Sequence, residues 1–255
     1  MELFYFNVKG KTSVYKRSDQ NGSYTYSYIL LTQQALKGMI GAIIGLKGYD
    51  NFSGQSDDNS LEFNRVFREL KCGIVPHFAE NNFSIYYNTR TNATGLANLS
   101  SGQGGKQGAS LLLREQWIAD VQYSIYLDVS AIEQKYREKL KRYLENEEAT
   151  YLPYLGRKEH FAQIYNFKTI GGEPLNEKKI VCKSTLPKED IKQAKRISKS
   201  REDVIAFTEM SPFDMDDDLY HLFKEYLYTN QQITLKGKEL IGDYYRTEEG
   251  VICLY

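Results

Sequence analysis

The sequence predicts an α+β fold, in which strands and helices alternate along most of a 255-residue chain. Three observations point to it: an apolar, aromatic start, two helical segments placed well apart, and a long polar stretch inserted between strand-like segments. With 41% apolar residues the chain can bury a sizeable core, which excludes a disordered protein. There is no run of 18 uncharged apolar residues, no secretory pattern at the start, and three widely spaced cysteines. We therefore expect a cytoplasmic protein with reduced thiols and no membrane partner.

The first half of the chain predicts a strand, a helix and further strands. Residues 2–8, ELFYFNV, have strand-like apolar density. A helix is expected from Gln33 to Leu46 with Thr32 as its N-cap, and its glycines at 38, 41, 45 and 48 share one face that suits close packing. Residues 61–78 are expected to form one or two strands, and residues 83–87 another.

The second half repeats the alternation. Residues 121–129 predict a long strand, and Ser130 with Glu133 predicts a capping box for a helix reaching about Glu147. Strands are expected at 161–167 and 179–183. The resulting order predicts a ferredoxin-like (RRM-like) βαββαβ domain over residues 1–204, with an insertion. Residues 205–255, with a helix expected at 219–228 and tyrosine-rich strands, predict a small C-terminal β-rich lobe.

Motifs for cofactor and metal chemistry fail on spacing, so we expect no cofactor, no metal and no catalytic group. The stretch GQGGKQG at 102–108 lacks both the glycine spacing of a dinucleotide loop and the Ser or Thr that follows a P-loop lysine. An acidic run matches four EF-hand positions at Asp214, Asp216, Asp218 and Glu225, but Leu219 stands where that loop needs glycine. No histidines or cysteines have zinc-ligand spacing. His160, among basic neighbours, suits either a general base or a surface histidine without a chemical role.

Basic and aromatic residues are interleaved in three places. They follow the first strand (Tyr15, Lys16, Arg17), lie in or beside the polar stretch (Arg90, Lys106, Arg114), and surround a Leu-Gly turn (Tyr151, Tyr154, Arg157, Lys158). Aromatic faces with cations are typical of single-stranded RNA recognition. Because the formal net charge is zero, a surface shared between RNA and protein partners is favoured over a free nonspecific binder.

The order of these features resembles a known family. A first strand, KGKTSVYKR, the helix LTQQALKGMIGAIIGL, a Gly-rich insertion, QYSIYLDV and YLPYLGRKEHFAQI together resemble the CRISPR-associated family-five subunit of type I Cascade complexes, in the RAMP superfamily. Residues 1–185 carry the likeness, which is nearest to subtype I-B. The resemblance implies an inserted long β-hairpin, the thumb, at about 87–117 with its tip within 88–108. It also implies antiviral defence: the subunit binds the 5′ handle of the CRISPR RNA (crRNA), caps the family-seven backbone filament, contacts the family-eight large subunit, and meets target DNA in the complex.

The resemblance and the basic runs together indicate a set of RNA-binding residues. We expect Arg17, Lys37 and Arg157 on handle phosphates, and Tyr28 or Tyr154 stacked on a base. The full set is Lys16, Arg17, Tyr28, Lys37, Arg90, Gln103, Lys106, Gln107, Arg114, Tyr154, Gly156 and Arg157.

The preferred hypothesis is a non-catalytic RNA-binding subunit. The alternative is a metal-independent endoribonuclease that processes precursor crRNA. The resemblance allows it, because one branch of the family, in subtype I-C, cuts the precursor RNA itself. A third possibility is a tyrosine-rich interaction protein that binds no RNA.

Overall fold

A computed structural model describes residues 1–20, 24–48, 61–77, 85–92, 111–195, 204–216 and 218–255. Its centre is a six-stranded sheet. Strand β7 (Leu111–Asp128) has β1 (Glu2–Ser13) on one side, with β8 (Gln163–Gly171) beyond it, and β5 (Lys71–Pro76) on the other. All of these pairs are antiparallel. Strand β3 (Tyr24–Thr25) and strand β6 (Ile85–Asn92) also pair with β7, nearer its start.

Three helices pack against the main sheet: α1 (Gln33–Ile44), α2 (Glu62–Val66) and α3 (Gln134–Glu145). Strand β1 alternates, as an inner strand covered on both faces should. Phe4, Phe6 and Val8 lie in one core cluster with residues of α1 and α3. Leu3 and Tyr5 point the other way, into a second cluster that contains residues near the C-terminus. The helices therefore bury one face of β1, and residues near the C-terminus bury the other.

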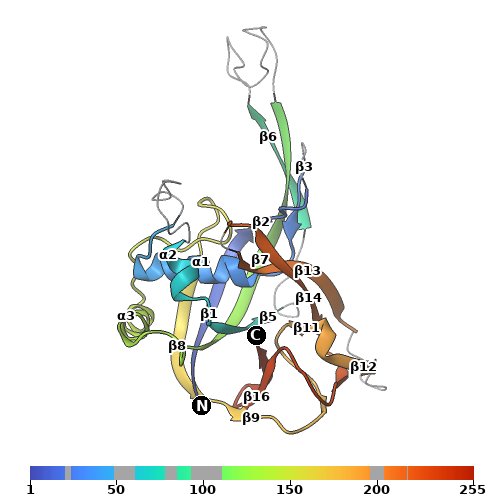
Figure 1. Cartoon of the computed structure of the whole chain (residues 1–255). Helices are drawn as coiled ribbons and strands as arrows, with labels where there is room; N and C mark the ends of the chain where they lie inside the picture. Colours follow the sequence, from blue (N-terminus) through green and yellow to red (C-terminus); the bar gives the residue numbers. More distant parts are fainter. Residues whose placement is uncertain (21–23, 49–60, 78–84, 93–110, 196–203, 217) are drawn as a thin grey trace.

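The longest strand, β7, also forms one arm of a hairpin that projects beyond the body of the protein (Figure 1). Its partner is β6, in a register that runs from Ile85 opposite Ile118 to Asn92 opposite Leu111. The polar insertion between two strands is thus framed by an antiparallel pair. The tip residues Gln103, Lys106 and Gln107 lie outside the described residues.

The rest of the chain forms small sheets. Strands from 173–195 pair with strands from 206–254, so segments on both sides of residue 204 are interleaved. The sheets are β10–β15–β12, β11–β14–β13 and β17–β16–β9, and a ladder β2–β4 lies beside β1. The bounds are β2 (Tyr15–Lys16), β4 (Ser27–Tyr28), β9 (Glu173–Pro174), β10 (Lys179–Ile180), β11 (Leu186–Pro187), the 3-10 helix η3 (Lys188–Asp190), β12 (Ile191–Lys195), β13 (Ala206–Met215), β14 (His221–Thr229), β15 (Gln232–Leu235), β16 (Asp243–Thr247) and β17 (Gly250–Leu254).

Two expected elements have another structure. Residues 61–78 were expected to be strands only, but α2 precedes β5, because Phe63 packs tightly against α1, where a Cβ on Gly41 would lie 2.6 Å from the Phe63 Cβ. The expected helix at 219–228 is wrong as well, since His221–Thr229 is strand β14. Leu219 has a φ of +65°, which breaks a helix at its first turn, and β13 supplies a pairing partner.

The first helix and its cap are confirmed, whereas the second cap is wrong. The Thr32 hydroxyl accepts the Ala35 N–H at 3.2 Å, and Gly45, with a φ of +76°, ends α1 in a left-handed cap. Helix α3 instead begins after Glu133, which makes no side-chain cap hydrogen bond. Ser130 lies in the preceding turn, where its N–H donates to Asp128 at 3.0 Å.

Candidate nucleic-acid interface

A groove of about 630 Å³ runs along α1, and segments far apart in the sequence close around it. Its walls are α1, the β2–β4 ladder, the loop at 151–156 and the β13–β14 hairpin. The lining residues are Tyr15, Lys16, Tyr28, Thr32, Gln34, Ala35, Gly38, Met39, Ala42, Leu46, Lys47, Gly48, Phe63, Tyr151, Tyr154, Gly156, Pro212 and His221. Aromatic faces, two lysines and small helix residues make this a surface suited to single-stranded nucleic acid.

The sequence of α1 hollows the groove. Ala35, Gly38 and Ala42 are spaced three and four residues apart, so they share one face of the helix and leave it without bulk. A Cβ at Gly38 would meet only the Phe63 ring, at 3.8 Å. The predicted close packing therefore applies to Gly41, whereas Gly38 keeps the groove open.

The Tyr-Leu-Gly turn forms the opposite wall. Leu155 is fully buried, its carbonyl accepts the Val14 N–H at 3.1 Å, and its N–H donates to the His160 carbonyl at 2.7 Å. Gly156 has a φ of +87°, and a Cβ there would overlap the Val14 carbonyl oxygen. Only glycine lets the turn lie this close to the chain after β1. The turn thereby holds Tyr151 and Tyr154, whose exposed fractions are 60% and 45%, at the rim of the groove.

Four predicted RNA-binding residues meet at this groove: Lys16, Tyr28, Tyr154 and Gly156. Arg17 lies across the ladder from it. The Arg17 guanidinium carbon is 5.4 Å from the centre of the Tyr28 ring, and its side chain forms hydrogen bonds with Asp19 at 2.8 and 3.1 Å. Arg17 lines a neighbouring hollow of about 310 Å³ together with Tyr26 and Glu209.

Two predicted phosphate contacts lie elsewhere. The Lys37 side chain is only 3% exposed, and its ammonium donates to the Arg68 carbonyl at 3.4 Å. Arg157 forms an ion pair with Glu115, whose side chain is 4% exposed. That pairing gives a buried carboxylate a cationic partner.

The remaining predicted residues belong to the hairpin. Arg114 is exposed near its base, hydrogen-bonds the Tyr24 hydroxyl, and lies 5.2 Å from the centre of that ring. Tyr24 and Tyr26 stack on each other at 5.9 Å. Arg90 is on β6, with its backbone opposite Leu113.

Several groove residues are absent from the predicted RNA-binding set. Tyr151 and Lys47 carried a usable signal, since each is an aromatic or basic residue beside a predicted turn or helix end. Gln34 and His221 carried none. Gln34 looks like an ordinary polar residue of a helix, and His221 was assigned to a helix that does not exist.

His160 is not the surface histidine that was one of its two expected roles. Its side chain is 2% exposed, its Nδ1 is 2.6 Å from the Thr12 hydroxyl, and its ring meets Trp117 edge-on at 4.8 Å. It packs behind the Tyr-Leu-Gly turn, whose backbone it binds, and it does not line the groove.

Glu209, on β13, forms hydrogen bonds with the backbone of the segment that precedes α1. Its carboxylate oxygens accept the Ile29 N–H, each at 3.1 Å, and one accepts the Leu30 N–H at 3.4 Å. Burial raises the pKa of Glu209 to about 7, although these amides and the charge of Arg17 act in the opposite direction.

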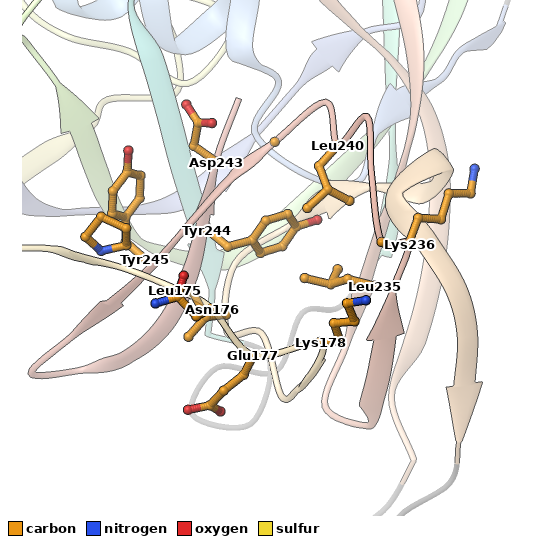
Figure 2. A pocket seen from close by; sticks show the side chains of 13 residues that line it. Leu175, Asn176, Glu177, Lys178, Leu235, Lys236, Leu240, Asp243, Tyr244 and Tyr245 are labelled. Atoms are coloured by element: carbon orange, nitrogen blue, oxygen red, sulfur yellow. The ribbon is translucent and has the colours of Figure 1, made fainter.

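A separate hollow of about 390 Å³ lies among the C-terminal strands (Figure 2). Tyr244, Lys178 and Leu235 stand around it. The fully buried Asp190 accepts the hydroxyl of Tyr244 at 2.9 Å and the N–H groups of Ile241 and Gly242 at 2.7 and 2.9 Å. These polar groups satisfy one another, and no predicted RNA-binding residue lines this hollow.

Metal-ligating clusters of three or more His, Cys, Asp or Glu side chains are absent from the described residues. Of the acidic run, Asp216 instead organises a turn, accepting the N–H groups of Asp218 and Tyr220 at 3.1 and 2.8 Å. Among the described helices, none has the length and apolar character needed to cross a membrane.

Comparison with known proteins gives likeness in structure only. No family model matches the sequence, and no curated protein matches it. A crystal structure of a CRISPR protein from Archaeoglobus fulgidus is similar, with a TM-score of 0.50 and 10% identity over 99% of this chain and 98% of that one. A chain of a CRISPR RNA-guided surveillance complex also matches, with a TM-score of 0.49 and 12% identity over 91% of each chain. So does a chain of the Type III-B Cmr-beta complex bound to cognate target RNA and AMPPnP, with a TM-score of 0.48, 11% identity, and 92% and 86% of the two chains covered. At this identity the first likeness establishes a shared mixed α+β fold.

Proposed function

We propose that this chain is a non-catalytic, family-five subunit of a type I CRISPR effector complex, nearest to subtype I-B, and that its groove along α1 binds the 5′ handle of crRNA. The observation that carries the proposal is the convergence of Lys16, Tyr154 and Gly156 beside the hollowed face of α1. Backbone subunits of family seven, the family-eight large subunit and target DNA are its proposed partners.

The proposed frame is ferredoxin-like with a thumb. The order β5–β7–β1–β8 in the sheet, with α1 after β1 and α3 after β7, supports it. The hairpin of β6 and β7 supports the thumb, which would extend from the frame toward guide and target.

Chemistry at His160 gains no support from its surroundings. A general base must reach the proton that it removes, but this imidazole is buried between Thr12 and Trp117. The endoribonuclease therefore remains the alternative that the experiment must separate from simple binding.

The first test combines the purified chain with labelled CRISPR-repeat RNA in EDTA, on native and denaturing gels. We expect a shifted band on the native gel and intact RNA on the denaturing one. Cleavage at a single position would favour the processing nuclease. If neither is seen with the chain alone, the measurement is repeated with the chain co-expressed with backbone subunits, and absence of RNA from that complex would contradict the proposal.

A second test measures the salt dependence of RNA affinity for Lys16→Ala and Lys47→Ala. Each lost phosphate contact on a single strand should reduce the slope of log K against log salt by about 0.7. Lys9→Ala is a matched control, because Lys9 lies over Tyr165 on the β8 side of the sheet, away from the groove. Slopes unchanged from wild type in both groove variants would remove them from the interface.

A further inference from the structure

Four residues that line the groove have a buried polar side-chain atom without a hydrogen-bond partner in the described part of the chain: the hydroxyls of Tyr15 and Tyr28, Oε1 of Gln34 and Nδ1 of His221. Of these, Gln34 and His221 carry the amide and imidazole groups that can pair with the edge of a nucleobase. Buried polar atoms in folded proteins are nearly always hydrogen-bonded, and an exception calls for a physical explanation. Four exceptions among the residues of one groove point to a ligand that supplies the missing partners.

Gln34 is held by its amide nitrogen. The side chain is 7% exposed, and its Nε2 donates to Asn64 Oδ1 at 3.4 Å and lies 2.9 Å from the Met215 sulfur. The amide nitrogen therefore has partners within the chain, and the amide oxygen is the atom still available to bind a ligand. Because the last torsion of a glutamine is broad, a small rotation can turn this oxygen toward a donor in the groove.

His221 and Gln34 share Met215 as a neighbour. His221 begins β14 directly opposite Met215, the residue that touches Gln34. Burial lowers the pKa of His221 below its ordinary value, so the ring is neutral at pH 7. A neutral imidazole has one donor and one acceptor nitrogen, so Nδ1 can take either role.

We propose that Gln34 and His221 read the hydrogen-bonding edge of one unpaired nucleobase of the bound RNA, an inference that rests on the proposed RNA-binding function. The edge of an unstacked base carries N–H donors beside acceptors, which complement a carbonyl oxygen and an imidazole nitrogen. Tyr151 and Tyr154 at the rim supply faces for stacking, and Lys16 and Lys47 supply charge for the flanking phosphates. The groove would therefore select a base at one position of the RNA.

The experiment uses repeat-derived handle RNA in which each nucleotide in turn is replaced by the other three bases or by an abasic site. For the wild-type chain we expect one position at which the wrong base weakens affinity roughly 5- to 150-fold, the range of a well-formed pair of base-edge hydrogen bonds. Gln34→Met and His221→Phe keep the approximate volume and remove the hydrogen-bonding atoms. Each should flatten the preference at that position and leave the preferences elsewhere unchanged.

Gln163→Met is the matched control, since Gln163 is exposed on β8 away from the groove, and it should behave as wild type. Gln34→Met also removes the hydrogen bond from Nε2 to Asn64 Oδ1, so a somewhat lower thermal midpoint is expected, and affinities are compared at a temperature where each variant is folded. An equal loss of affinity for every RNA, with the preference at the one position retained, would identify Gln34 as structural and overturn its assignment.

The outcomes separate the two proposals. If the wild-type chain and its complex bind none of these RNAs, the proposed function fails. If RNA binds but no position shows a base preference, or if both variants retain the preference, RNA binding stands and the reading by Gln34 and His221 is overturned.

Discussion

Two of the arginines predicted to bind RNA are paired with carboxylates of the chain itself. Arg17 is held by Asp19, and Arg157 by the buried Glu115, which also accepts the Trp117 indole N–H at 3.3 Å. Removing Arg157 would take away the cation that compensates a buried carboxylate, and would destabilise the protein whatever the role of Arg157 in RNA binding. Exposed Lys16 is therefore the more informative residue to change.

Glu209 predicts a pH dependence of stability. Its ordinary pKa of 4.5 rises to about 7 on folding. The folded state then holds this proton more tightly, so the free energy of unfolding should fall as pH rises from about 4.5 to about 7, by at most about 3 kcal/mol. Glu209→Gln keeps an oxygen for the Ile29 N–H but does not ionise. The free energy of unfolding of Glu209→Gln minus that of wild type should therefore be larger at pH 8 than at pH 5, as measured by urea unfolding at both pH values. An equal difference at the two pH values would contradict the assignment.

Gly156 predicts a severe local substitution. Gly156→Ala places a Cβ against the Val14 carbonyl at a positive φ, which should cost more than about 2 kcal/mol in the free energy of unfolding. Gly171→Ala is the control, because a Cβ there has nothing within 4 Å and φ lies outside the left-handed region. Similar denaturant midpoints for the two variants would mean that the turn moves away at little cost.

At the scale of elements, the two predicted helix caps behave differently. Thr32→Ala removes the hydroxyl that accepts the Ala35 N–H and should destabilise the protein by about 1 kcal/mol. Ser130→Ala should change stability by less than about 0.5 kcal/mol, since Ser130 is an exposed residue of the turn before α3. Chemical denaturation of both variants tests this, and equal losses would show that Ser130 has a capping role in solution.

The misassigned strand β14 shows why element type was hard to predict there. Leu222, Phe223, Tyr226 and Leu227 have spacing that suits a helix, but a ten-residue β13 pairs with them along their length. Cross-strand partners were invisible to a periodicity argument, and tertiary pairing overrides a weak local preference.

At the scale of the whole molecule, the C-terminal strand completes the main core. Ile252, on β17, is fully buried in one cluster with Leu3, Tyr5 and Tyr126 of the main sheet. Ile252→Ala should therefore cost about 2–5 kcal/mol and lower the stability of the main sheet itself. Hydrogen exchange of the β1 amides measures this. Unchanged protection in β1, with loss confined to residues 205–255, would show that the C-terminal lobe unfolds independently.

Local chemistry in the sequence determined β1 and α1 with its Thr32 cap, because apolar strand density and a helix cap depend on neighbours within a few residues. Four residues of the candidate site, Lys16, Tyr28, Tyr154 and Gly156, could be named in advance from the basic and aromatic runs and the family resemblance. Only the tertiary structure decided that Lys37 and His160 are buried, that Arg157 pairs with Glu115, and that His221 reaches the groove. Burial and charge pairing join residues tens to hundreds of positions apart, and the spacing of residues along one chain carries no record of those contacts.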